Sequence, residues 1–600
     1  MKTPFRVLSL LGICCLLIIY SCQSDKAISK NKTPQTTAKD KTPIDVIVEV
    51  PRTAEPPPPP PVIEEVPEDE IVIEEEPVFI DQDVEEDEEV GIELAYDAST
   101  PLAMKKEHIY TRTWTAKDQV THNTEEYAPF VENEFLSALN EPLSTFSIDV
   151  DNASYSNVRR YLNDYQTPPK GAVRIEEFVN YFNYDYPQPN GVDPFSINTE
   201  VSDCPWAPQH KLIHIGLQGR QMDAEQMPPS NLVFLLDVSG SMSQQNKLPL
   251  LKKAFQLLVQ QLREEDRVSI VVYAGASGLV LPPTSGSNKQ AIMDALLRLE
   301  SGGSTAGAAG IKLAYQTAEK SLIKNGNNRI ILATDGDFNV GTSSTSELVK
   351  LIEEKRKSGV AISILGFGMG NYKDGRMEQI ADNGNGNYAY IDNMNEAKKV
   401  FVNELGGTLH TIAKDVKLQI EFNPAHVKEY RLVGYENRKL KNEDFNNDKK
   451  DAGDLGAGHT VTALYEIVPV GSESSLSSNV DKLKYQERKV KRFAKHDKDL
   501  VSIKLRYKKP NGTVSKLLET TAHDKGLALE KTSDNFRFSA SVASFAQILR
   551  DSKFKGNANF KQVSQLAQGA IGKDKFGYRK EFIDLVQKAK EIELRMTARK

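Results

Sequence analysis

The sequence predicts an α/β fold in which a doubly wound, mostly parallel sheet is inserted into a flanking β-sandwich, with C-terminal helices and a disordered N-terminal tether. Apolar runs alternate with amphipathic stretches over residues 231–406, and stretches on both sides of this segment alternate with a period of two. The chain before residue 130 instead combines an apolar start with proline-rich and acidic runs. Continuous apolar strands are typical of a parallel sheet covered on both faces, whereas alternation is typical of antiparallel strands.

The length and composition of the chain allow several domains. It has 600 residues, of which 39% are hydrophobic and 26% are charged, as in ordinary globular proteins. The net charge is −8. Its distribution is uneven, because the N-terminal part is strongly acidic and the C-terminal end is rich in lysine, and this argues against nucleic acid as the main partner. Cys14, Cys15, Cys22 and Cys204 suggest no disulfide framework, and Cys204 is expected to be a small buried apolar side chain.

Residues 1–21 have the features of an export signal. Lys2 and Arg6 precede the uncharged apolar run Val7–Tyr20, which is short for a membrane-spanning helix. The following Ser21-Cys22 resembles the lipobox of bacterial lipoproteins, so Cys22 is predicted to carry a lipid that anchors the chain to a membrane of the cell envelope, with the outer membrane favoured. The alternatives are a simple cleaved signal and a buried helix.

Residues 22–129 are predicted to form a disordered, proline-rich and acidic tether. Pro56–Pro61 is a proline run with polyproline II character, and no basic residue occurs between Arg52 and Lys105. Dense glutamate makes such a segment repel itself and extend. A solvated spacer is the favoured interpretation; the alternative is a partner or cation site, because residues 71–73 and 78–80 are apolar enough to form short strands.

Residues 130–190 are expected to form an N-terminal helical cap. Residues 145–151 alternate as a strand does, and Ala153–Leu162 and Ile175–Phe182 show helical spacing. Asp149 and Asp151 are candidate ligands, but turn or helix-cap roles are favoured for both.

Within residues 231–406, buried strands and amphipathic helices take turns. The expected strands are Leu232–Leu236, Arg267–Tyr273, a short edge strand Leu279–Pro282, Arg329–Thr334, Ala361–Gly366 and Asn387–Ile391. The expected helices are Lys247–Arg263, Lys289–Leu299, Gly307–Leu322, Ser346–Lys357, Arg376–Asn383 and Asn395–Glu404. In such folds the functional site lies at the carboxyl ends of the strands.

Five oxygen-bearing side chains stand at these strand ends: Asp237, Ser239, Ser241, Thr305 and Asp335. Two carboxylates with neutral hydroxyls, and no His or Cys, suit Mg²⁺, with Mn²⁺ or Ca²⁺ as alternatives. Few of these ligands are charged, so the metal is expected to keep a position for a carboxylate from outside the chain. Helix capping without metal is the alternative, since Ser and Asp are good N-caps.

These residues resemble the Asp-x-Ser-x-Ser motif and its partners in the metal-ion-dependent adhesion site (MIDAS) of von Willebrand factor type A (VWA) domains, which have a Rossmann-like fold. The resemblance covers Asn231–Gly406. It implies that Asp237, Ser239 and Ser241 contact the metal or its waters, that Thr305 joins them in the open state, and that Asp335 binds directly or through water. It also implies that movement of a helix beside the site couples to ligand binding.

The wider arrangement resembles a family of bacterial VWA lipoproteins that have a C-terminal domain of unassigned role. Residues 333–341 carry this resemblance most clearly, and it extends over most of Ser144–Lys590.

The two flanks of the VWA segment are expected to form one β-sandwich, from residues 191–230 and 407–515. Its predicted strands are Phe195–Val201, Lys211–Leu217, Val416–Phe422, Thr460–Val468 and Leu500–Tyr507. Residues 516–600 are expected to be helical, with helices Asn535–Leu549, Phe560–Ala567 and Arg579–Ile592. The basic stretch Lys482–Lys498 is interpreted as a solvated loop, or else as a partner of the acidic tether or of an anionic envelope surface.

Binding of a protein partner, which supplies an acidic side chain to the metal, is the predicted function, and the chain is not expected to be an enzyme. One alternative is a Mg-dependent hydrolase of the phosphatase type, but the position two residues after Asp237 is Ser239 rather than a second aspartate. Neither a Gly-x-x-x-x-Gly-Lys-Ser/Thr loop nor a His-Glu-x-x-His motif occurs. A structural envelope spacer with a non-functional site is the third possibility.

Overall fold

The computed structural model describes residues 124–304, 307–336, 345–404, 410–473, 476, 484–485 and 488–599. All of them belong to one compact unit, Arg112–Lys600. Cys22, Thr305 and residues 1–123, which include the signal and nearly all of the predicted tether, lie outside the described residues. No helix among the described residues has both the length and the apolar composition needed to cross a bilayer.

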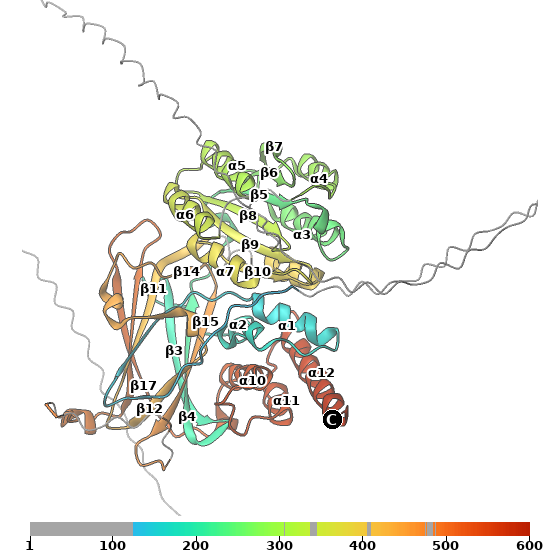
Figure 1. Cartoon of the computed structure of the whole chain (residues 1–600). Coiled ribbons are helices and arrows are strands. Elements are labelled where there is room, and N and C mark those ends of the chain that lie inside the picture. Colours follow the sequence, from blue (N-terminus) through green and yellow to red (C-terminus); the bar gives the residue numbers. More distant parts are fainter. Residues whose placement is uncertain are drawn as a thin grey trace, which may run out of the picture. The chain divides into compact units, whose positions relative to one another are not determined.

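The central sheet is the predicted doubly wound sheet (Figure 1). Its edge strand β7 is antiparallel to β6, and all other neighbours are parallel. The order across the sheet is β10 (Tyr388–Ile391), β9 (Ala361–Phe367), β8 (Asn327–Thr334), β5 (Ser230–Asp237), β6 (Arg267–Tyr273) and β7 (Ser277–Ser285). Every residue of β5 is buried, as expected for a strand covered on both faces.

Helices cover both faces of this sheet. One face packs against α3 (Leu248–Gln261), α4 (Lys289–Leu297), α8 (Met394–Lys398) and the π-helical turn Lys399–Asn403. The other packs against α5 (Gly307–Lys320), α6 (Thr345–Lys355) and α7 (Asp374–Asn383). Alternate residues of β5 enter the two cores, with Phe234 in the first and Leu235 in the second.

The segments before and after the central sheet together build an antiparallel β-sandwich, which confirms the predicted insertion. One layer has the order β1 (Leu136–Ser137), β12 (Val427–Val433), β15 (Thr460–Pro469), β4 (Ala207–Gly219) and β3 (Phe195–Cys204). The other has the order β13 (Lys439–Leu440), β2 (Leu143–Ser147), β11 (Thr411–Phe422), β16 (Asp499–Lys508) and β17 (Lys516–His523), and β14 (Gly453–Gly456) also pairs with β11. Ile215 and Ala463 of the first layer share one core with Leu418 and Ile503 of the second.

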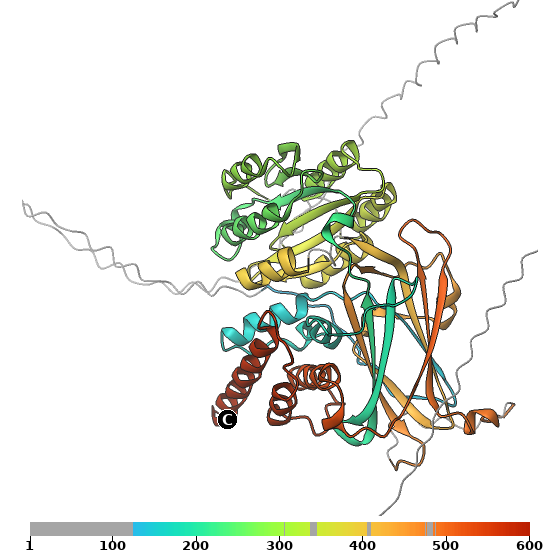
Figure 2. The ribbon, with the colours of Figure 1, turned by 180° about the vertical axis from the view of Figure 1, so that it is seen from behind.

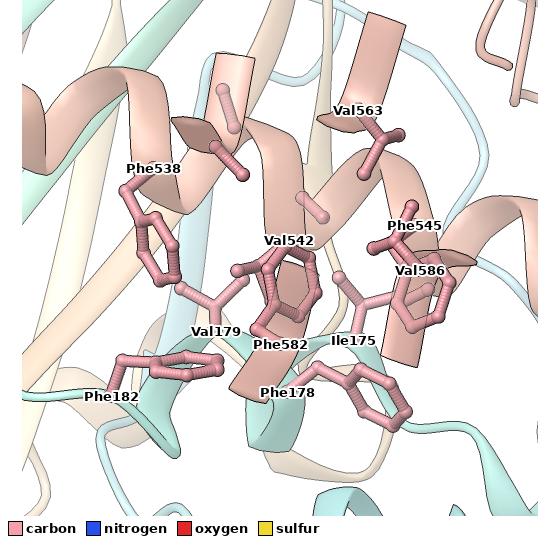
Figure 3. Close-up of a cluster of buried hydrophobic side chains, with 14 of the residues drawn as sticks. Ile175, Phe178, Val179, Phe182, Phe538, Val542, Phe545, Val563, Phe582 and Val586 are labelled. Atoms are coloured by element: carbon pink, nitrogen blue, oxygen red, sulfur yellow. The ribbon is translucent and has the colours of Figure 1, made fainter. Parts of the chain in front are cut away.

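The third part of the fold is a helical unit whose helices come from two segments that are far apart in the sequence (Figure 2). Its core contains side chains of α1 (Ala153–Asn163), α2 (Ile175–Asn180), α10 (Asp534–Leu549), α11 (Phe560–Gln568) and α12 (Tyr578–Arg599). Figure 3 shows the phenylalanine and valine side chains of these helices pointing toward one another. The predicted cap helices and C-terminal helices are therefore one unit rather than two.

Three of the predicted boundaries are wrong. The tether cannot extend to residue 129, because Glu125 and Tyr127 bond with Arg160 and Tyr161 of α1. The 130–190 segment is not only a helical cap, since β1 and β2 complete the two sandwich layers. β17 lies in the sandwich although residues 516–600 were expected to be helical. In each case the local pattern was too short to reveal a partner strand or helix far away in the sequence.

Candidate metal site

Asp237 ends the central strand β5, and its side chain is fully buried. One carboxylate oxygen, Oδ1, accepts the backbone N–H of Ser239 at 2.9 Å. The hydroxyls of Ser239 and Ser241 lie 3.1 Å apart. The loop after β5 therefore presents one carboxylate and two hydroxyls side by side, as its sequence predicts.

Asp335 follows β8, the parallel neighbour of β5, so the two strands end at the same edge of the sheet. The hydroxyl of Thr334 donates to Asp237 Oδ2 at 3.1 Å, and Ser241 is hydrogen-bonded to Asp335. The structure thus brings together four of the five predicted side chains: Asp237, Ser239, Ser241 and Asp335. Thr305 lies outside the described residues, but the backbone of its loop is held against the Ser239–Ser241 loop, because Gly240 donates to the carbonyl of Gly303 at 3.1 Å.

Two further residues at this edge were not predicted. The ammonium of Lys247, just before α3, donates to Asp335 Oδ2 at 2.9 Å, and the amide of Asn371 donates to the same oxygen at 3.1 Å. The side chain of Lys247 is only 3% exposed. Asn371 follows strand β9, so the rule that functional residues follow strand ends could have found it; no local signal marks Lys247.

The two carboxylates have different electrostatic surroundings. Burial, together with the negative charge of Asp335, raises the pKa of Asp237 to about 6, against the hydrogen bonds from Ser239 and Thr334. Burial also acts to raise the pKa of Asp335, but the Lys247 charge and hydrogen bonds from Lys247, Ser241 and Asn371 outweigh it, so this pKa is lowered. Among the described residues, Asp335 forms an ion pair with Lys247, whereas no ion pair joins Asp237 to a cation.

This donor set fits a hard divalent cation. Its two carboxylates and two hydroxyls offer only oxygen, which Mg²⁺ prefers, and a cation here would offset the unfavourable charge of Asp237. The described part of the chain, this site included, has no group of three or more His, Cys, Asp or Glu side chains arranged to hold a metal, so a metal here would depend on the two hydroxyls as well as the two carboxylates. Asp149 and Asp151, the other candidate ligands, are instead paired with Arg438 at 3.4 and 3.0 Å.

In metal-free protein, Asp237→Asn is expected to raise the unfolding temperature above pH about 6. The pKa of Asp237 is about 4 in the unfolded chain and about 6 in the folded protein. At low pH the carboxyl is protonated in both states, so folding buries no charge. The cost of burying the charge grows between these values and is complete above them, on the order of 2 kcal/mol. Calorimetry in EDTA at acidic and neutral pH tests this. An asparagine variant that is no more stable than wild type at neutral pH would show that the charge carries no such cost.

The start of the described chain lies against the loop that carries Asn371. Thr124 donates its backbone N–H to the carbonyl of Gly370 at 2.8 Å, and Glu126 donates to that of Tyr372 at 2.9 Å. Glu125 accepts from Gly370 at 2.7 Å and from Arg160. Burial opposes ionisation of Glu125, but the Arg160 hydrogen bond and charge lower its pKa to about 2. The N-terminal segment is thereby fixed beside the candidate metal site.

Gly336 permits the close approach of this loop to Asp335. Its φ of 87° lies in the left-handed region, and a Cβ there would lie 2.8 Å from the backbone nitrogen of Lys373. Glycine satisfies both requirements.

Comparisons with known proteins agree with this architecture. The family model described as von Willebrand factor type A domain matches residues 231–403, and a model described as the C-terminal part of YfbK matches residues 407–592. A third model, described as von Willebrand factor, matches residues 121–214. The Uncharacterized protein YfbK of Escherichia coli (strain K12) is 45% identical over 488 residues, which cover 79% of this chain and 83% of that protein. The chain belongs to the YfbK family.

Other similarities extend beyond the YfbK family but cover less. The Uncharacterized protein sll0103 of Synechocystis sp. is 31% identical over 189 residues, covering 32% of this chain and 44% of that protein. Among solved structures, a von Willebrand factor type A protein from Catenulispora acidiphila matches with a TM-score of 0.35 and 14% identity, over 76% of this chain and 91% of that one. This member of the YfbK family combines a VWA domain with the sandwich and helices described above.

Proposed function

We propose that this member of the YfbK family is an envelope lipoprotein that binds a protein partner through a divalent metal. Asp237, Ser239, Ser241, Thr305 and Asp335 would hold the metal, Mg²⁺ or else Mn²⁺ or Ca²⁺, and a partner carboxylate would complete its coordination. The observation that carries this proposal is the convergence of four all-oxygen side chains at one sheet edge. The inclusion of Thr305 rests on the sequence motif.

Binding, rather than catalysis, is the proposed role of this site. The metal would supply a positive charge with an open coordination position, and the chain's own residues would orient it. Lys247 already balances Asp335, so few negative charges remain to reduce the attraction for an incoming carboxylate. The lipid would be attached to Cys22, and the membrane would be bacterial, with the outer membrane favoured. Labelling with radioactive palmitate that Cys22→Ser abolishes would support this anchor.

Calorimetric titration with Mg²⁺ and Mn²⁺ tests the metal site. We expect one saturable site in wild type, and we expect Asp237→Ala to weaken binding by at least about a hundredfold, because it removes one of the two carboxylates that would hold the metal or its waters. Asp294→Ala is the matched control, since Asp294 is exposed on α4, and it should bind as wild type does.

The titration is repeated in the presence of acetate, a simple carboxylate that can take the place of the partner's side chain. A site that binds metal only when an outside carboxylate completes its coordination is then also detected. Absence of binding under both conditions, or equal binding by wild type and Asp237→Ala, would contradict the proposal. Phosphate-ester hydrolysis that requires Asp237 would instead support the catalytic alternative.

A further inference from the structure

The connection between β15 and β16 contains a dense group of cations. We call residues 484–485 and 488–498 of this connection the basic loop. They contain one acidic residue, Asp497, in a chain whose net charge is −8. The cationic residues, all exposed, are Lys484, Arg488, Lys489, Lys491, Arg492, Lys495 and Lys498.

Large apolar side chains are exposed among these cations. Tyr485 is 87% exposed and Phe493 is 65% exposed. Phe493 begins a single 3-10 turn, and the ammonium of Lys491 lies 5.8 Å from its ring. Val470 and Leu476, in the same connection, are 54% and 46% exposed. The connection thus exposes aromatic rings beside cationic side chains, the combination that suits the boundary between water and a bilayer.

The strand registers place the basic loop at the end of the sandwich remote from the VWA domain. Gln218, next to the exit from β4 toward that domain, pairs with Thr460 at the start of β15, whereas Lys211 pairs with Ile467 near its end. The chain therefore leaves β15 and enters the connection about 25 Å from the end of the sandwich that is joined to the VWA domain. Figures 1 and 2 show the orange segment projecting from that end.

We propose that the basic loop is a membrane-surface site that takes the headgroups of anionic phospholipids, with Phe493 and Tyr485 entering the interfacial layer. Each Lys or Arg near an anionic bilayer adds to the attraction for its headgroups, and aromatic rings favour the interface between water and hydrocarbon. The proposed lipid anchor would bring the chain near a bilayer, but headgroup binding is a property of the loop itself.

This placement leaves the candidate metal site available to a partner. β5 begins at Ser230, next to the residues that join the VWA domain to the sandwich, and it ends at Asp237. At the beginning of the sheet, Arg329 and Ala361 line a cavity with His410 and Asp454 of the sandwich side. The metal-binding edge and the basic loop are therefore at opposite ends of two successive bodies.

Cosedimentation with vesicles tests the membrane site. The chain from Gln23 to Lys600 is mixed with vesicles of phosphatidylcholine, or of phosphatidylcholine and phosphatidylglycerol. We expect binding only to the second kind, weakening as salt screens the charges. The triple variant Lys491→Glu, Arg492→Glu, Lys495→Glu should bind at least about tenfold more weakly. Phe493→Ser should bind several-fold more weakly, and its salt dependence should be unchanged.

A matched variant separates the basic loop from the net charge of the chain. Lys561→Glu, Lys580→Glu and Lys590→Glu make the same charge change at exposed positions of the C-terminal helical region. Equal loss of binding in both triple variants would overturn the proposal. So would vesicle binding by Arg112–Lys600 but not by Gln23–Lys600, because the chain's own acidic stretch would then be the occupant. The basic-loop variant should bind Mg²⁺ as wild type does. The membrane-site proposal and the metal-site proposal can therefore be tested independently of each other.

Discussion

Replacing Phe582 by alanine is expected to destabilise the protein by about 3–5 kcal/mol, because a buried phenyl ring is lost and a cavity remains. Phe582 is fully buried in α12. Its ring centroid lies 5.7 Å from that of Phe182, 5.5 Å from that of Phe538 and 5.3 Å from that of Phe545 (Figure 3). Since Phe182 follows α2 closely and Phe538 and Phe545 belong to α10, the substitution weakens contacts between parts of the chain that are far apart in sequence.

Scanning calorimetry of wild type and Phe582→Ala measures this effect. Phe576→Ala is the control, because Phe576 precedes the same helix but is 43% exposed, so its unfolding temperature should change little. If Phe582→Ala unfolds at the same temperature as Phe576→Ala, the helical core does not contribute to the observed transition.

Replacing Arg159 by methionine is expected to lower the free energy of unfolding by about 3–5 kcal/mol, because it leaves buried carboxylates without their cation. Arg159 lies in α1 and is 1% exposed. Its guanidinium donates to Asp392 at 2.8 Å, to Glu396 at 2.7 Å and to Glu581 at 3.1 Å. These partners belong to the end of the VWA domain and to α12, so one side chain links three segments.

Denaturant unfolding of Arg159→Met tests this prediction. Arg298→Met is the control, since Arg298 is exposed at the end of α4 and its loss should change stability by less than about 0.5 kcal/mol. The double variant Arg159→Met, Glu396→Gln should recover part of the loss, because Glu396 is the fully buried member of the group. A double variant less stable than Arg159→Met alone would argue that burial of the Glu396 charge is not the cause.

The sequence predicted the central sheet because that signal is local. Each of its buried strands is a short apolar run, and each of the predicted helices between them has its own amphipathic spacing. The order of these elements also places Asp237 and Asp335 at the same edge, since parallel strands end together. In the structure these two carboxylates lie together with Ser239 and Ser241.

The flanking sandwich was predictable in kind but not in detail. Strands β3, β4, β11, β15 and β16 were expected from their alternation. β12 was missed, and β17 was assigned to the helical region. Which short alternating segment becomes a strand depends on its partner, and β17 is defined by pairing with β16.

The sequence by itself determined the alternation of elements, the insertion of one domain into another and the loops that carry the candidate ligands. Only the tertiary structure decided that Lys247 and Asn371 contact Asp335, that Arg159 joins three segments, and that the cap and C-terminal helices share one core. The physical reason is range. Hydrophobic period and turn chemistry act over a few neighbouring residues, whereas a buried charge or a packed ring takes its partner from any part of the chain that folding brings within contact.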